Sequence, residues 1–433
     1  MTRKVKKHSV YQSELKCGAR VLLIDIPQSS DFHVSVNFRS GTRFFEPEMH
    51  QVPHLLEHMV FEGTEKYPDH KAFLKEVESI KADCNASTNP DFNSYYLTGK
   101  SGHATKLIEL AIELSFKSTL PDKRLAEEKS VIEHELSEYA QSTGFLGDYI
   151  NKATIFPKLY PDFDQVMKSL QEITVQDLKN ARGKFYVPNN AFIVVAGKLP
   201  QSRRPNVLKL IATLLGGLPG GKRQILKKIK METKGRFINR VSTPKSDRGA
   251  FDIYFFREKN DTYLPPLRVF EALCSGNSEK SIEMKLRDSG LVYELEADSG
   301  LTLDATSFSF SGTTKRDSLS SVIDLIFSEL SNALSDQLTE QEVSQACEWV
   351  IDMTKADLQD TLSLVEWYEP AFVDEEALQS PNDWIAKINK VTTADILNLK
   401  KTLINPSRMA LTLFGHRIHW FWRRYEKIID RAF

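Results

Sequence analysis

The sequence predicts an α+β protein made of two homologous α/β sandwich domains, each with a largely antiparallel sheet and helices packed on one face. Three observations support this prediction. The chain has 433 residues, more than a single domain usually holds. Apolar strand-like runs and long helical patterns both occur but do not alternate regularly, which argues against a parallel βαβ sheet. The third observation is an internal repeat.

The repeat relates the two halves of the chain at a fixed sequence offset of 218. Five identities define it, and Thr174, Asp177, Asn180, Pro188 and Gly197 recur as Thr392, Asp395, Asn398, Pro406 and Gly415. The matching elements are the helices 173–186 and 391–404, the strands 191–196 and 409–414, and the strands 33–38 and 251–256. Such self-similarity indicates two copies of one structural unit.

A glycine- and proline-rich stretch, 216–221, separates the copies, and a lysine-rich stretch follows it. We therefore predict an N-terminal domain over 1–215, a linker over 216–245 and a C-terminal domain over 246–433.

The most informative motif is His54-Leu55-Leu56-Glu57-His58, an H-x-x-E-H sequence. On a helix, positions i, i+3 and i+4 share one face, so the two imidazoles and the carboxylate project together. Two neutral imidazoles can bind Zn²⁺, and the carboxylate can then take a proton from a zinc-bound water. The motif therefore predicts a catalytic zinc site.

A third protein ligand is expected from the segment around 125–138, which reads as a helix. Its predicted apolar face consists of Leu125, Val131, Ile132 and Leu136. A carboxylate that completes a His₂Glu set leaves one coordination position open for water, as in catalytic zinc sites. Spacing alone leaves several ligands open, namely Glu128, Glu133, His134, Glu135 and Glu138.

The motif, its continuation over 59–64 and the E-x-x-V-I-x-x-E pattern from Glu128 to Glu135 resemble the pitrilysin/insulinase family of zinc metallopeptidases. In size the chain is similar to the family's single-unit members, which resemble mitochondrial processing peptidases. The resemblance implies that Glu135 is the third zinc ligand. It also implies that Glu128 is an outer carboxylate that orients the site.

The segment 85–96 is similar to the family's N-A-x-T-x-x-D-x-x-x-Y-Y stretch. By this resemblance Asn85 and Ala86 lie on an exposed strand edge, to which the substrate adds as a further strand. Main-chain hydrogen bonds then supply affinity for many sequences, and side-chain pockets add preference.

The second copy carries Ala272, Ser275 and Gly276 at the positions of the three motif residues, so it is expected to lack a metal site. The family uses an R-x₆-Y element of its later domains to hold the substrate backbone near the zinc. Tyr293 matches that element, but Arg287 stands one residue too close to it. The resemblance thus implies a substrate-clamping role for Tyr293 and, with altered spacing, for Arg287.

Composition excludes several other classes of protein. The net charge is −1 and the pI about 6.8, so nothing favours binding to nucleic acid. No apolar run reaches the ~20 residues of a transmembrane helix, and the basic N-terminus lacks the apolar core of a secretory signal. Four scattered cysteines suit a reducing compartment. We therefore expect a cytoplasmic location.

Together these features predict a zinc-dependent endopeptidase, with one Zn²⁺ per chain, that acts on peptides or unfolded segments. Glu57 is the expected general base, and the resemblance implies a clamshell chamber formed by two such chains. A homodimer is expected and a heterodimer stays open. The alternatives are a catalytic subunit that needs a heterologous partner, or a non-proteolytic scaffold subunit. The aromatic and basic tail from residue 420 could dock on its own domain, cover a subunit interface or touch a membrane.

Overall fold

The computed structural model describes residues 5–232, 235–275, 281–333, 335, 337–418 and 422–432. It divides into two compact units, neither of which is continuous in sequence. Unit 1 comprises Met1–Leu136, Pro161–Lys227 and Lys355–Gln379, and unit 2 comprises Ser137–Tyr160, Lys228–Thr354 and Ser380–Phe433. Each half of the chain therefore contributes one helical segment to the unit that the other half mainly forms. The domain boundaries predicted from the sequence stay a prediction.

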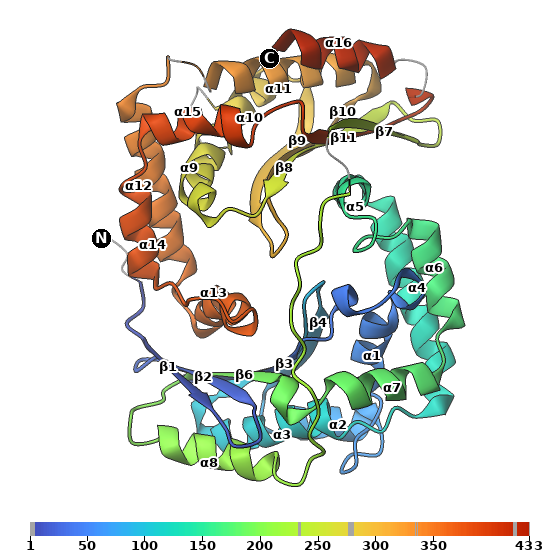
Figure 1. The fold of residues 1–433 in the computed structure, drawn as a ribbon, viewed down its shortest axis with the longest axis vertical. Helices are drawn as coiled ribbons and strands as arrows, with labels where there is room; N and C mark the ends of the chain where they lie inside the picture. Colours follow the sequence, from blue (N-terminus) through green and yellow to red (C-terminus); the bar gives the residue numbers. More distant parts are fainter. Residues whose placement is uncertain are drawn as a thin grey trace. The chain divides into compact units, whose positions relative to one another are not determined.

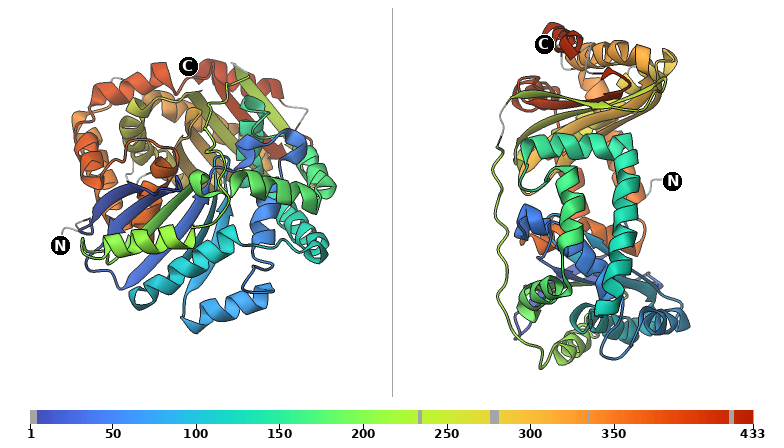
Figure 2. Two further views of the ribbon diagram at one scale, coloured as in Figure 1. Left: turned by 60° about the horizontal axis from the view of Figure 1, so that its bottom comes forward. Right: turned by 90° about the vertical axis from the view of Figure 1, so that its right-hand side faces the viewer.

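The sheet of unit 1 has six strands within the described residues. They are β1 (Ser9–Glu14), β2 (Arg20–Asp25), β3 (Asp31–Phe38), β4 (Asp83–Thr88), β5 (Asn93–Lys100) and β6 (Ala191–Gly197). Their order is β1-β2-β6-β3-β5-β4 (Figure 1), and β2 and β6 pair in parallel while the other neighbours are antiparallel. The late strand β6 thus lies between two early ones (Figure 2, left).

Helices cover both faces of this sheet. They are α1 (Val52–Val60), α2 (His70–Ser79), α3 (Ala104–Phe116), the first part of α4 (Leu125–Gln141), α6 (Phe163–Glu172), α7 (Val175–Phe185), α8 (Arg204–Leu214) and α13 (Thr361–Val373). Helix α3 packs against β3 and β5 on one face, and α13 packs on the opposite face (Figure 1). The α13 face is apolar, with Phe192 and Val194 of β6 in one cluster with Leu364 and Phe372.

Unit 2 repeats this plan. Its described strands are β7 (Arg236–Ser242), β8 (Arg248–Glu258), β9 (Val292–Leu301), β10 (Ala305–Lys315) and β11 (Met409–Gly415), in the order β7-β11-β8-β10-β9. Its helices are α5 (Thr143–Ile155), α9 (Leu264–Ser275), α10 (Ile282–Asp288), α11 (Leu319–Ala333), α12 (Glu340–Asp357), α14 (Pro381–Ile388), α15 (Thr393–Thr402) and α16 (Trp422–Ala432). The predicted α+β class is confirmed, and the structure adds an exchanged helix on each sheet.

The internal duplication is visible in local detail. Helices α7 and α15 each begin with a capping box, formed by Thr174 with Asp177 and by Thr392 with Asp395. The bounds of the exchanged helices α5 and α13 differ by the offset of the repeat. Strands β6 and β11 also differ by the offset of the repeat. Each pairs with one neighbouring strand in parallel and with the other antiparallel.

One predicted equivalence is wrong by a single residue. Ala191 pairs with Phe38, and its equivalent Met409 pairs with Phe255. Strands β3 and β8 therefore correspond at an offset of 217, not 218. A shift of one residue exchanges the two faces of a strand. The alternation of apolar and polar residues contains the signal, since Val34 and Val36 flank Ser35 just as Phe251 and Ile253 flank Asp252.

The described part of the C-terminal tail docks on its own unit. Helix α16 packs against α11 and buries Tyr425, Ile428 and Ile429. Ion pairs between Arg431 and Asp324 and between Arg236 and Asp430 add to this contact. Residues 420 and 421 lie outside the described part. Across the described residues, no helix combines the length and apolarity that crossing a bilayer requires.

Candidate metal centre

Helix α1 turns the three motif residues away from the core. Six of its nine residues are buried, namely Val52, Pro53, Leu55, Leu56, Met59 and Val60. The other three are His54, Glu57 and His58, which are partly exposed. The helix is thus anchored by its apolar residues and presents the predicted i, i+3, i+4 set on one accessible face.

Glu135 of α4 meets this face. Its Oε2 lies 3.5 Å from His54 Nε2 and 3.7 Å from His58 Nε2. One ligand atom from each of the three residues lies within 4.8 Å of the other two. Two imidazole nitrogens and one carboxylate oxygen are therefore close enough together to hold one metal ion.

The other candidates on α4 lie elsewhere. Glu128 is buried and contacts Nδ1 of His58, whereas Glu135 lies near Nε2 of the same ring. Glu133 Oε2 accepts a hydrogen bond from Gln171 Nε2 at 3.1 Å, and His134 is exposed. Glu138 is exposed and lies in the part of α4 that belongs to unit 2. Among the candidates that spacing left open, the structure thus brings Glu135 to the two histidines.

The predicted apolar face of α4 needs one correction. Ile132 and Leu136 are buried as expected, but Val131 is 45% exposed. The buried row of the helix instead runs through Glu128, Ile132 and Leu136, at intervals of four. The resemblance gave Glu128 an orienting role, but the helix pattern did not place it in the buried row, because an acidic residue normally faces solvent. Here its partners explain the burial.

Hydrogen bonds at the Nδ1 atoms orient both imidazole rings. His58 Nδ1 donates to Glu128 Oε2 at 3.2 Å, and His54 Nδ1 donates to Gln51 Oε1 at 3.2 Å. A proton on Nδ1 leaves the Nε2 lone pair facing Glu135, which is the tautomer that metal binding requires. Gln51 was not predicted from the sequence, although its position three residues before His54, at the N-cap of α1, could have suggested it.

Arg124 is a second residue that the sequence reading missed. Its guanidinium pairs with Glu62, Glu127 and Glu128, the last at 3.3 Å between Nη2 and Oε1. Because Glu128 also contacts His58, Arg124 is connected to the histidine–glutamate cluster through Glu128. The i, i+4 spacing of Arg124 and Glu128 was its only sequence signal.

The electrostatics of the cluster favour a cation. Desolvation acts to lower the pKa of His58, but the hydrogen bond to Glu128 and the charges of Glu135 and Glu57 outweigh it and raise that pKa. The pKa of Glu128 is lowered, first by its hydrogen bond to His58, and that of Glu135 is lowered, first by its hydrogen bond to His54. Both carboxylates therefore stay ionised and attract positive charge.

Glu57, the predicted general base, is held by a neighbouring strand. Its Oε2 accepts a hydrogen bond from Thr88 Oγ1 at 2.5 Å. Glu57 lies on the same helix face as the two histidines and is left outside the ligand set. It is thus placed to act on a molecule bound at the metal position.

Asn85 and Ala86 lie on β4, which ends the strand order of unit 1. Asn85 is exposed, and its Oδ1 accepts from the Ala86 N–H at 2.8 Å. That N–H therefore faces away from the ladder with β5. The predicted strand edge exists, and its use by a substrate stays a prediction.

Arg287 and Tyr293 belong to unit 2. Arg287, on α10, forms an ion pair with Glu283 at 2.7 Å. Tyr293, on β9, is 55% exposed, and the Arg248 guanidinium lies 5.8 Å from its ring centre. Of the second-copy residues at motif positions, Ala272 and Ser275 lie on α9, and Gly276 lies outside the described part. The clamping role of Arg287 and Tyr293 stays a prediction.

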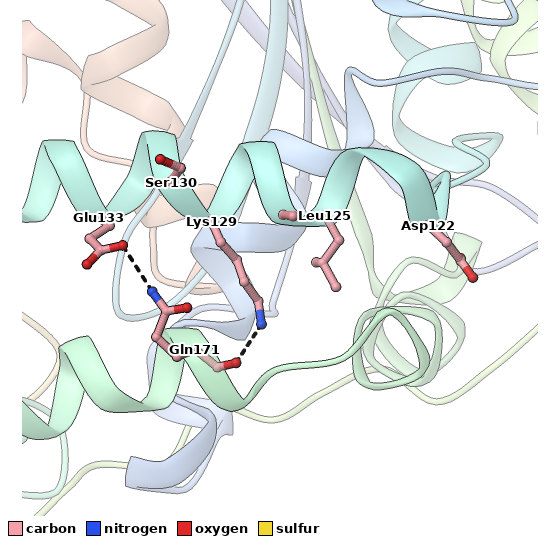
Figure 3. Close-up of a pocket in the computed structure, with 7 residues that line it drawn as sticks. Asp122, Leu125, Lys129, Ser130, Glu133 and Gln171 are labelled. Carbon is pink, nitrogen blue, oxygen red and sulfur yellow. Dashed lines mark hydrogen bonds between the residues drawn. The ribbon is translucent and has the colours of Figure 1, made fainter.

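A depression of about 410 Å³ lies on another side of α4 (Figure 3). Lys129 and Glu133 of α4 point there toward Gln171 of α6, and both bind it. Lys129 Nζ donates to the Gln171 carbonyl at 2.7 Å. These polar groups satisfy one another, so the depression is a helix–helix crevice and is distinct from the metal-ligand cluster.

Comparison with known proteins finds matches to family models in both halves of the sequence. Residues 20–156 match the family model described as Insulinase (Peptidase family M16). Residues 172–348 match the model described as Peptidase M16 inactive domain. The first match contains the complete histidine–glutamate cluster, whereas the second covers the half that lacks the motif.

Individual relatives are distant but extensive. An uncharacterised zinc protease of Bacillus subtilis is 23% identical over 356 residues, which are 80% of this chain and 84% of that protein. Human cytochrome b-c1 complex subunit 1 is 26% identical over 190 residues, 41% of this chain and 37% of that protein. The crystal structure of a Helicobacter pylori protease superimposes with a TM-score of 0.84 at 17% identity, covering 95% of this chain and all of that one.

Since two models of one family together match more than half of the sequence, one in each half, the chain belongs to the insulinase family of peptidases, M16.

Proposed function

We propose that this protein is a zinc-dependent endopeptidase that hydrolyses peptides or unfolded protein segments. The observation that carries the proposal is the convergence of His54, His58 and Glu135, with Glu57 beside them on α1. Family membership alone would not carry it, because the relatives include both a zinc protease and a subunit of a respiratory complex.

The donor set fits Zn²⁺. Two imidazole nitrogens and one carboxylate oxygen form a His₂Glu set, which leaves a coordination position open for water or substrate. Glu128 and Gln51 fix the two rings from behind, as outer partners of zinc-bound histidines do. Zn²⁺ bound there would supply Lewis acidity, which acidifies water and polarises a carbonyl group.

Glu57 performs the proton transfers in this mechanism. Its carboxylate takes a proton from the attacking water as that water adds to the scissile carbonyl carbon. It then passes the proton to the departing amine nitrogen, so that the peptide bond breaks with no net change in the enzyme. His54, His58 and Glu135 would hold the metal ion and take no part in these proton transfers.

Strand β4 offers a binding mode for the substrate. An extended peptide that pairs with the free edge at Asn85 and Ala86 would gain main-chain hydrogen bonds that do not depend on its sequence. Only unfolded chains or short peptides can add as a strand. In this proposal Tyr293, and with altered spacing Arg287, clamp the substrate from unit 2.

The assembly state is part of the proposal. We infer a homodimer that encloses substrate, with a heterologous partner as the alternative.

A cytoplasmic location is also part of the proposal. It is supported by the four cysteines, Cys17, Cys84, Cys274 and Cys347, which form no disulfide bonds, as is usual in a reducing compartment.

A second candidate is a non-catalytic scaffold subunit. The relative in the cytochrome b-c1 complex and the match of the second half to an inactive domain favour it. The complete candidate ligand set and the hydrogen bonds that orient its histidines favour catalysis, because a scaffold role does not require them.

Cleavage of a library of unstructured peptides tests the proposal, with the Glu57→Gln variant measured in parallel. We expect the wild type to cleave, and the variant to retain zinc but lose turnover. Cleavage by the variant at the wild-type rate would refute the mechanism. A zinc-loaded wild-type protein without any cleavage would favour the scaffold or the missing-partner alternative.

A further inference from the structure

Glu57 is bound by one residue to which neither the motif nor the mechanism above assigns a role. Thr88, the last residue of β4, places its Oγ1 2.5 Å from Glu57 Oε2. Thr88 is partly buried, and α1 packs against β4. The contact is therefore part of the packed interface between a helix and a strand of unit 1.

The direction of this hydrogen bond is fixed by a third residue. Asn93 Nδ2 donates to Thr88 Oγ1 at 2.6 Å. A threonine hydroxyl has one proton, and its oxygen is here already engaged as an acceptor. The proton is therefore free to point at Glu57, whose carboxylate can only accept.

The Asn93 amide is itself held in one orientation. Its Oδ1 accepts from Ser40 Oγ at 2.8 Å, and its Nδ2 donates to the Pro53 carbonyl at 3.1 Å. A flipped amide would place its oxygen against the Pro53 carbonyl oxygen, which cannot donate. Asn93 is fully buried, so unpaired polar atoms would be costly here. Ser40 and Pro53 thus determine which atom Asn93 offers to Thr88.

The backbone holds the same residues together. Thr88 and Asn93 are directly paired across the β4–β5 hairpin. Asn89 closes the turn, with its Oδ1 accepting from the backbone N–H groups of Asp91 and Phe92 at 2.9 Å each. Pro53 lies in the first turn of α1. The hydrogen-bond chain therefore ties the hairpin to the helix that carries the metal ligands.

The two oxygens of the Glu57 carboxylate have different surroundings. Oε2 is occupied by Thr88, and within the described residues no side chain hydrogen-bonds Oε1. A general base must have its accepting oxygen aimed at the proton it removes. Holding Oε2 restricts rotation of the carboxylate, and so leaves Oε1 in a defined position.

We propose that Thr88, directed by Asn93, is a positioning residue that orients Glu57 for proton transfer. The inference rests on the proposed peptidase function and deepens it. Thr88 lies two residues after Ala86 on the same strand. A peptide that pairs with the edge of β4 would therefore be aligned by the strand that also aligns the base.

Two substitutions test this role. Thr88→Val keeps the shape of the side chain but removes the hydroxyl, and Thr88→Ser keeps the hydroxyl but removes the methyl group. We expect Thr88→Val to lower kcat on an unstructured peptide about 10- to 100-fold, with KM and zinc content close to wild type. Thr88→Ser should restore most of kcat. Thermal denaturation of both variants shows whether they are folded.

The outcomes separate this inference from the proposed function. Wild-type kcat in Thr88→Val would overturn the positioning role. A kcat in Thr88→Ser as low as in Thr88→Val would also overturn it, because the retained hydroxyl would then not suffice to orient Glu57. If wild-type protein cleaves and Glu57→Gln does not, the peptidase function stands whatever Thr88 does. If zinc-loaded wild type cleaves nothing, this chain is not a self-sufficient peptidase, and the positioning role fails with that proposal.

Discussion

Asn151 of α5 and Glu369 of α13 occupy equivalent positions in the internal repeat, and each binds the strand beneath its helix. Asn151 Nδ2 donates to Asp252 Oδ1 on β8 at 2.6 Å. Glu369 accepts from Ser35 Oγ and Asn37 Nδ2 on β3. Because the register of β3 and β8 is shifted by one, Ser35 and Asp252 are equivalent. The carboxylate is thus on the helix in one unit and on the strand in the other.

The buried carboxyl of Asp252 predicts a pH-dependent stability. Burial raises its pKa to about 8, the nearby Asp148 adds to the rise, and Asn151 and Lys152 oppose it. The folded protein therefore keeps a proton that the unfolded chain, with a pKa near 3.8, has lost. Stability from this group is complete below about pH 4 and is lost as the pH rises toward 8.

Replacing the carboxyl by an amide should remove this dependence. We expect the free energy of unfolding of Asp252→Asn, relative to wild type, to increase by about 3 kcal/mol between pH 5 and pH 8. Denaturant unfolding at the two pH values measures it, with Asp288→Asn at the exposed end of α10 as the control. A difference that does not change with pH would mean that Asp252 is ionised in the folded protein.

The paired capping boxes predict equal losses in the two halves. Thr174 and Thr392 each accept a hydrogen bond from the residue three positions later, and that aspartate binds back to the threonine N–H. We expect Thr174→Ala and Thr392→Ala each to lower the free energy of unfolding by about 1 kcal/mol. Threonine-to-serine variants, which keep the hydroxyl, should lose little. A loss in only one half would show that the two boxes are not equivalent in energy.

Much of this architecture followed from local chemistry. The capping residues, the apolar strands and the H-x-x-E-H spacing are short-range signals, and they predicted the repeat, the fold class and the face of α1 that carries the ligands. The family resemblance is confirmed by both matched domains. It also singled out Glu135, which the helix pattern alone had left among five candidates.

The remainder depends on contacts between distant segments. Asn93 approaches Thr88 only because a hairpin pairs them, and Glu57 approaches Thr88 only because α1 packs on β4. The exchange of α5 and α13 between units has no local signal, because it depends on contacts with strands that are distant in the sequence. The register of β3 against β8, by contrast, had a local signal in the polar residues Ser35 and Asp252, which the identities at offset 218 obscured.

Glu135 predicts the largest effect on metal binding. Its oxygen is the third member of the cluster, and an uncharged amide is a weaker ligand for Zn²⁺. We expect Glu135→Gln to weaken zinc binding by more than about 100-fold, beyond the usual cost of changing an outer partner. Titration against a chelator measures it, with Glu133→Gln on the same helix as the matched control. Equal affinities in the two variants would move the third ligand to another residue.

Glu128 predicts a smaller effect of a different kind. It orients His58 through the Nδ1 proton and is supported by Arg124, but it contributes no atom to the ligand cluster. Glu128→Gln keeps an oxygen that can accept a hydrogen bond from His58 Nδ1. It removes the negative charge that strengthens the imidazole as a metal ligand. Zinc affinity should therefore fall about 10- to 100-fold, while kcat at saturating zinc stays near wild type. Glu127→Gln, which alters an exposed partner of the same arginine, should leave both quantities unchanged. A collapse of kcat in Glu128→Gln at full zinc loading would instead place Glu128 among the residues that act on the substrate.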